Sequence, residues 1–99
     1  MKMNTSTALD IIYQAIDALN DLRSADEQIE KSPDVALAGD GGCLDSLGLI
    51  TLTLAVERRV AQVTGKPIVL LDESDYDANM ARLATPQTFA ELVVQQAST

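Results

Sequence analysis

Residues 45–65 read DSLGLITLTLAVERRVAQVTG, and they decide the fold of this 99-residue chain. Apolar residues recur here at steps of three and four, which predicts an amphipathic α-helix. Asp45 is a favourable N-cap, and Gly65 followed by Pro67 favours a helix end. The apolar stripe consists of Leu49, Leu52, Val56, Val60 and Val63, broadened by Leu47, Ile50, Leu54 and Ala61. Because this surface is wide, we expect the central helix of the domain here, ending at about Val63 or Thr64 and contacting several other helices.

A second amphipathic helix is predicted upstream, over residues 5–22. Thr7 followed three residues later by Asp10 resembles a capping box, with Asn4 or Thr5 as alternative starts. The expected core stripe consists of Leu9, Ile12, Ile16, Leu19 and Leu22, with Ile11 and Ala15 beside it.

The last helix is predicted to begin with Thr85 as N-cap and Pro86 at the first helical position. Its expected core face consists of Phe89, Leu92 and Val93, with Ala90 and Val94 beside them. We expect a short, acidic third helix over residues 72–83, preceded by an extended connector over residues 68–71. No second good strand is present to pair with that connector.

The segment 23–44 is a long loop, because the apolar periodicity fades and Pro33 interrupts any helix. Four apolar residues are expected to attach it to the core: Ile29, Val35, Leu37 and Leu44. The elements together predict a single all-α domain over residues 1–99. We expect a four-helix bundle of three longer helices and one short one around an aliphatic core.

The composition excludes several classes of function. Seven Lys and Arg against fifteen Asp and Glu give a formal charge of −8, so most of the surface would repel nucleic acids and anionic membranes. The chain has no His, which removes Ser-His-Asp and Cys-His nucleophile pairs and imidazole metal sites. We therefore expect no enzyme, but a protein on which partners with basic surfaces act.

The sequence also bears on the cellular compartment. Cys43 is the single Cys and forms no internal disulfide, which fits a reducing compartment. Residues 1–20 lack the uninterrupted apolar stretch of a signal peptide, because Asp10 and Asp17 interrupt it. The longest apolar run, residues 47–56, is too short to span a membrane. We expect a soluble, cytoplasmic monomer.

Three motifs resemble functional sites without meeting their requirements. Residues 39–42, Gly-Asp-Gly-Gly, lack the Lys and the spacing of a phosphate-binding loop, and we interpret them as a hinge. Asp75, Asp77 and Asn79 resemble the opening of a calcium loop, but the Gly and Glu that should follow are missing. Cys43 lies near a predicted helix start without a base partner, so we interpret it as a small apolar residue. We predict no metal site and no catalytic residue.

Ser46 differs from these candidates because it lies in the first turn of the helix predicted over residues 45–64, directly after a Gly-rich loop. A phosphate ester at this position would meet backbone N–H groups and the positive end of the helix dipole. The alternative is that Asp45 and Ser46 are only a capping pair. The local residues leave both interpretations open.

Residues 41–50, GGCLDSLGLI, resemble the phosphopantetheine attachment motif of acyl carrier proteins, with Asp45-Ser46-Leu47 as its core. An amphipathic helix lies upstream across a long loop, and an apolar helix follows. Residues 65–68, GKPI, and 85–92, TPQTFAEL, are similar to the connector and the last helix of that family. The resemblance covers residues 9–94.

The resemblance implies a discrete carrier whose Ser46 receives a covalent 4′-phosphopantetheine from coenzyme A, added by a phosphopantetheinyl transferase. The thiol of this arm would carry an acyl group as a thioester. It would present that group to acyl-transferring, condensing or modifying enzymes of a fatty-acid-like, polyketide-like or other specialised pathway. Asp45 and Leu47 would frame Ser46 for the transferase. The candidates for lining an acyl chain are Leu52, Val56, Ile68, Ala90 and Leu92.

The helix after Ser46 departs from the family pattern in its charge. Carriers of fatty acid synthesis usually have several carboxylates along it, whereas here Glu57 is the only acid and Arg58 and Arg59 follow. This predicts a specialised carrier that serves one dedicated pathway. Two alternatives stay open: an aminoacyl or peptidyl carrier, suggested by the two Gly before Cys43, and a small acidic helical interaction module without a prosthetic group.

Overall fold

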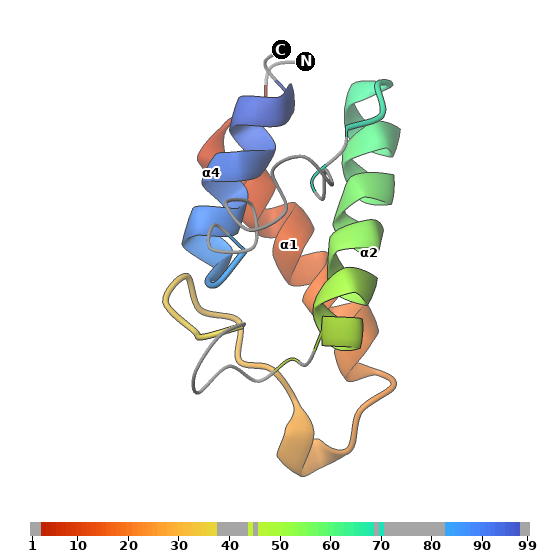
Figure 1. The fold of residues 1–99 in the computed structure, drawn as a ribbon, viewed down its shortest axis with the longest axis vertical. Coiled ribbons are helices and arrows are strands. Elements are labelled where there is room, and N and C mark those ends of the chain that lie inside the picture. Colours follow the sequence, from red (N-terminus) through yellow and green to blue (C-terminus); the bar gives the residue numbers. More distant parts are fainter. Residues whose placement is uncertain (1–2, 38–43, 45, 69, 71–82, 98–99) are drawn as a thin grey trace.

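The structure is a computed structural model that describes residues 3–37, 44, 46–68, 70 and 83–97. These residues form three α-helices, α1 (Thr5–Asn20), α2 (Ser46–Thr64) and α4 (Pro86–Ala97), and the 3₁₀-helix η1 (Ala25–Glu27). Helix α1 packs against both α4 and α2 (Figure 1). Among the described elements the central helix is therefore α1, whereas the sequence predicts residues 45–64 in that place. Small and branched side chains give α1 a broad buried surface: Ala8, Ile11, Ile12, Ala15 and Ile16.

Helix α1 begins at the predicted residue, Thr5, but it is capped differently than expected and ends two residues before Leu22. Asn4 is the N-cap, and its side-chain oxygen accepts a hydrogen bond from the Thr7 N–H at 2.8 Å, so the expected Thr7–Asp10 capping box is wrong. The helix ends at Asn20, and Leu22, expected in the core stripe, is 84% exposed. Asn20 instead bonds both backbone groups of Ile29: Oδ1 accepts from its N–H at 2.8 Å, and Nδ2 donates to its oxygen at 3.0 Å.

The loop after α1 is attached to the core as expected. Ile29, Leu37 and Leu44 are buried, and Val35 packs against them partly buried. The backbone of the loop also meets the start of α4, where the Gln87 N–H donates to the oxygen of Pro33 at 3.1 Å. That bond satisfies one of the first-turn N–H groups for which an α-helix has no internal acceptor.

Helix α2 begins and ends close to its predicted bounds, and α4 begins at Pro86 as predicted. Gly65 follows α2 with a φ of 75°, the left-handed conformation in which Gly commonly ends a helix. Thr85 precedes α4, and its Oγ1 accepts from the Thr88 N–H at 3.3 Å. The expected core residues of α4, Phe89, Ala90, Leu92 and Val93, are all buried.

The expected four-helix bundle is wrong, because the described residues contain three α-helices; the all-α class is consistent with them. Side chains from the described parts of the irregular segments also belong to the core: Leu37, Leu44, Leu70 and Leu83 are all buried. The Leu70 N–H donates to Glu57 Oε1 at 2.8 Å, which ties the connector to α2. The expected short helix over residues 72–83 lies outside the described residues except for Leu83, which is in a turn.

Candidate functional site

Ser46 is the first residue of α2. Two leucines hold this end of the helix on the core. Leu44 is buried and its N–H donates to the oxygen of Leu37 at 3.0 Å, and Leu49 is buried three residues after Ser46. Leu47, the residue directly after Ser46, is 73% exposed. The start of α2 is therefore fixed against the core, and the position next to Ser46 is open to solvent.

The remaining polar candidates from the sequence lie outside the described residues: 39–42, Cys43, Asp45 and 75–79. The capping interpretation of Asp45 is therefore still open beside the modification of Ser46. Within the part of the chain that the structure describes, no three His, Cys, Asp or Glu side chains come together as a metal site.

The five candidates for lining an acyl chain belong to the hydrophobic core. Leu52, Val56, Ala90 and Leu92 are fully buried there, and Ile68 packs against them partly buried. The structure thus places α2, the connector and α4 around the same core. These side chains are packed, so an acyl chain would have to displace some of them to enter.

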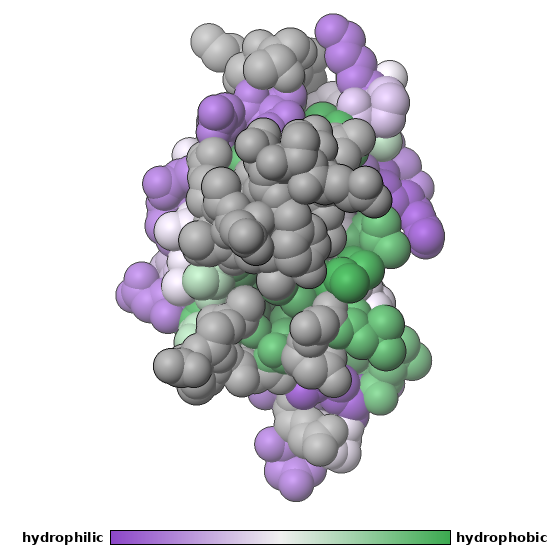
Figure 2. Space-filling model, viewed as in Figure 1, coloured by the Kyte–Doolittle hydropathy of each residue, from purple (hydrophilic) through white to green (hydrophobic). Residues whose placement is uncertain are grey.

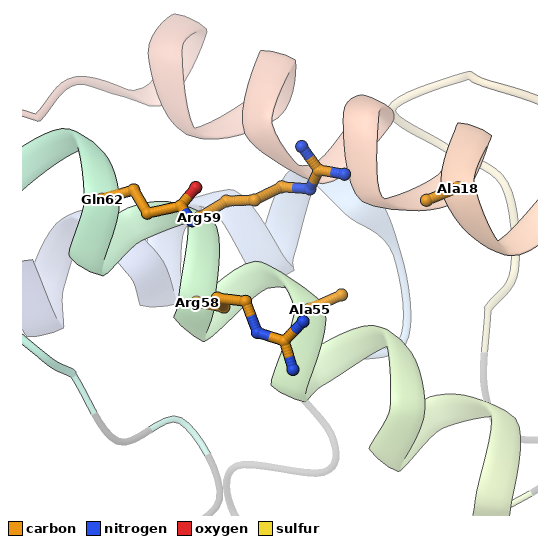
Figure 3. Close-up of a pocket in the computed structure, with 5 residues that line it drawn as sticks. All are labelled: Ala18, Ala55, Arg58, Arg59 and Gln62. Atoms are coloured by element: carbon orange, nitrogen blue, oxygen red, sulfur yellow. The ribbon is translucent and has the colours of Figure 1, made fainter.

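A groove of about 380 Å³ lies elsewhere, between α1 and α2, and we call it the α1–α2 groove. It is lined by Ala18 of α1 and by Ala55, Arg58, Arg59 and Gln62 of α2. Arg59 extends from α2 toward α1 (Figure 3). The small side chains of Ala18 and Ala55 leave room between the two helices. The sequence drew attention to the two arginines, but it gave no sign that α1 lies opposite them.

The guanidinium groups of this groove have no acidic partner within the described residues. No ion pair or hydrogen bond joins Arg58 or Arg59 to another described residue, whereas Lys31 pairs with Asp17 at 3.0 Å. The neighbouring acid Glu57 accepts from the backbone of Leu70 instead. Two consecutive positive residues thus have no acidic partner among the described residues, in a chain of net charge −8.

An exposed face runs along α2 from Leu47 toward this groove. Residues spaced by four, three, four and four positions form it, and we call them the α2 strip: Leu47, Thr51, Leu54, Arg58 and Gln62, all exposed. Hydrophobic residues gather on the surface over the first half of α2 (Figure 2). Leu47 and Leu54, which the sequence assigned to the broad apolar surface of this helix, are 73% and 53% exposed. Of the five residues expected in the core stripe of this helix, Leu49, Leu52, Val56 and Val60 are buried. Val63 is 42% exposed, so its assignment to the stripe is wrong.

Among the described helices, none combines the length and hydropathy needed to cross a lipid bilayer. Comparisons with protein families, with curated proteins and with solved structures return no match for this chain.

Proposed function

We propose that this protein is an acyl carrier protein that is modified at Ser46 by a phosphopantetheinyl transferase. The observation that supports this most directly is the position of Ser46 as the first residue of α2, followed by the exposed Leu47. The resemblance of residues 41–50 to the attachment motif of carrier proteins supports the same residue.

The modification transfers the phosphopantetheine group of coenzyme A to Ser46. The Ser46 hydroxyl oxygen attacks the phosphorus next to the pantetheine of coenzyme A. The bond from that phosphorus to the bridging oxygen breaks, adenosine 3′,5′-bisphosphate leaves, and the hydroxyl proton is lost. The transferase supplies the catalytic groups. The bound arm supplies a thiol that holds an acyl group as a thioester.

The chain's own part is to hold and present Ser46. The N-terminus of α2 carries the positive end of the helix dipole, which favours a phosphodiester at its first residue. Leu44 and Leu49 keep that end on the core, and the exposed Leu47 offers the transferase an apolar contact at the residue after Ser46. The acyl-transferring, condensing or modifying enzymes that would use the arm approach the same end of α2.

The charge of α2 supports a specialised carrier. Its second half carries the exposed Arg58 and the half-buried Arg59, and its one acid, Glu57, accepts a hydrogen bond from Leu70. An enzyme that binds its carrier through a basic patch would be repelled there. We therefore expect partners from one dedicated fatty-acid-like, polyketide-like or other acyl-handling pathway.

The test is modification of the purified chain by coenzyme A and two transferases of different substrate breadth, followed by intact mass spectrometry. We expect wild-type protein to gain the mass of one phosphopantetheine, and peptide mapping to locate it at Ser46. Ser46→Ala should gain no mass. The matched control is Ser6→Ala, which removes an exposed hydroxyl from the first turn of α1 and should leave the modification unchanged.

Wild-type protein left unmodified by both transferases would contradict the proposal. That outcome, with Ser46→Ala changing the free energy of unfolding by about 1 kcal/mol or less, would favour an interaction module in which Ser46 only caps α2. Full modification of Ser46→Ala would place the attachment at another residue.

A further inference from the structure

The described fold does not cover the apolar residues of the α2 strip. Its first half carries Leu47 and Leu54 in solvent, and the hydroxyl between them, on Thr51, already donates to the oxygen of Leu47 at 2.8 Å. Covering this half would bury apolar surface without leaving that hydroxyl unsatisfied. Leu22, 84% exposed just after α1, lies four residues beyond Ala18 of the α1–α2 groove.

The second half of the strip differs in charge from its first half. Arg58 and Gln62 belong to both the strip and the α1–α2 groove, and Arg59 extends across that groove toward α1 (Figure 3). The α1–α2 groove therefore lies next to the apolar half of the strip. It carries two guanidinium groups that form no ion pair with an acid among the described residues. On the α1 side, the exposed Asp21 is the acid three positions after Ala18.

This face is positively charged, whereas the chain as a whole is negatively charged. A partner with acidic side chains is repelled by most of a protein of net charge −8, and is attracted where Arg58 and Arg59 lie. At physiological ionic strength charges act over about 8 Å, so the nearby arginines outweigh distant carboxylates. Guanidinium groups also bind carboxylates through two parallel hydrogen bonds.

We propose that the α2 strip together with the α1–α2 groove is a docking face for an acidic protein partner. The partner covers Leu47 and Leu54 with an apolar pocket or ridge and places carboxylates against Arg58 and Arg59. From Leu47 to Gln62 the face is about 22 Å long, the length of an amphipathic helix of about 16 residues. This inference does not depend on the modification of Ser46.

The experiment uses the unmodified full chain and a synthetic amphipathic peptide of about 16 residues, with Leu along one face and Glu along both edges of that face. Binding is measured by fluorescence anisotropy at about 0.15 M salt, and its location by backbone amide NMR shifts. We expect saturable binding, with the shift changes confined to α2 and the facing side of α1. Arg58→Ala combined with Arg59→Ala should weaken binding about tenfold.

Matched variants separate this face from net charge and from general apolar contact. Lys66→Ala also removes an exposed positive charge but lies outside the face, so it should change binding by less than about twofold. Leu54→Ser should weaken binding about fivefold, and Asp21→Ala should strengthen it slightly. Circular dichroism and the NMR spectrum of each variant establish that it is folded.

Three results would overturn the proposal. The first is no saturable binding at about 1 mM peptide. The second is binding that Arg58→Ala/Arg59→Ala and Lys66→Ala weaken equally, which would make it a net-charge effect. The third is a short single-stranded DNA that binds the same face as tightly as the peptide, because the partner would then be a polyanion of another class.

Discussion

The two faces of α2 carry the same kinds of side chain in opposite environments. Leu49, Leu52, Val56 and Val60 are buried against the core, whereas Leu47 and Leu54 on the opposite face are more than half exposed. Both sets are apolar, and both fit helical spacing. The difference teaches that apolar periodicity identifies the apolar positions of a helix, whereas the packing of the fold decides which of them its core covers.

The largest expected effect comes from truncating the buried face. Leu52→Ala removes a fully buried side chain and leaves a cavity, so the free energy of unfolding should fall by about 2–5 kcal/mol. Leu54→Ala is the matched control on the same helix and should change it by less than about 0.5 kcal/mol. Urea unfolding followed by circular dichroism measures both. Equal losses would mean that Leu54 also belongs to the core.

A smaller effect is expected at Gly65, the residue that directly follows α2. Gly65 has a φ of 75°, and a Cβ built there would meet no atom within 4 Å. Gly65→Ala should therefore cost only the backbone preference, about 1–2 kcal/mol, with no clash to add. Gly65→Asn should recover part of that loss, because Asn tolerates this conformation better than Ala does. If Ala and Asn give the same stability in thermal unfolding, the left-handed conformation is not what limits this position.

Two threonines allow the same side chain to be compared on the exposed and the buried face of α2. Thr51 is exposed and Thr53 is buried, and each hydroxyl donates to the backbone oxygen four residues earlier, at 2.8 and 2.7 Å. Thr53→Val exchanges a buried hydroxyl for a methyl group, and that oxygen retains its helical N–H donor. We expect a gain of about 0.5–1 kcal/mol, against almost no change for Thr51→Val. A loss of stability in Thr53→Val, measured by urea unfolding, would show that the hydroxyl contributes more than its burial costs.

Sequence reasoning located the described helices well because their ends are marked locally. Gly65 and the Thr85-Pro86 pair act through backbone conformation and neighbouring hydrogen bonds, so a single sequence reveals them. The end of α1 was missed because Asn20 uses its side chain on Ile29, nine residues away, which no local pattern encodes. The loop side chains Ile29, Leu37 and Leu44 were found because isolated apolar residues in a polar loop rarely stay in water.

The candidate site also has one part that the sequence identified and one part that it did not. Ser46 could be singled out from a short motif and its place before an apolar run, and it begins α2 in the structure. The α1–α2 groove could not, because Ala18 and Arg59 come together only through the packing of two helices. The expected four-helix bundle is not matched, because the described residues form three α-helices and the expected short helix over residues 72–83 lies outside them apart from Leu83.

The smallest expected change in the free energy of unfolding is on the exposed face of α2, at Leu47. Leu47→Ser removes a side chain that is 73% exposed, so the free energy of unfolding should change by less than about 0.5 kcal/mol. The same variant should slow modification of Ser46 if the transferase contacts this leucine. Urea unfolding and the initial rate of mass gain, measured on one preparation, separate stability from recognition. A loss above about 1 kcal/mol would show that Leu47 supports the fold, and the contrast between the two faces of α2 would then fail at its most exposed leucine.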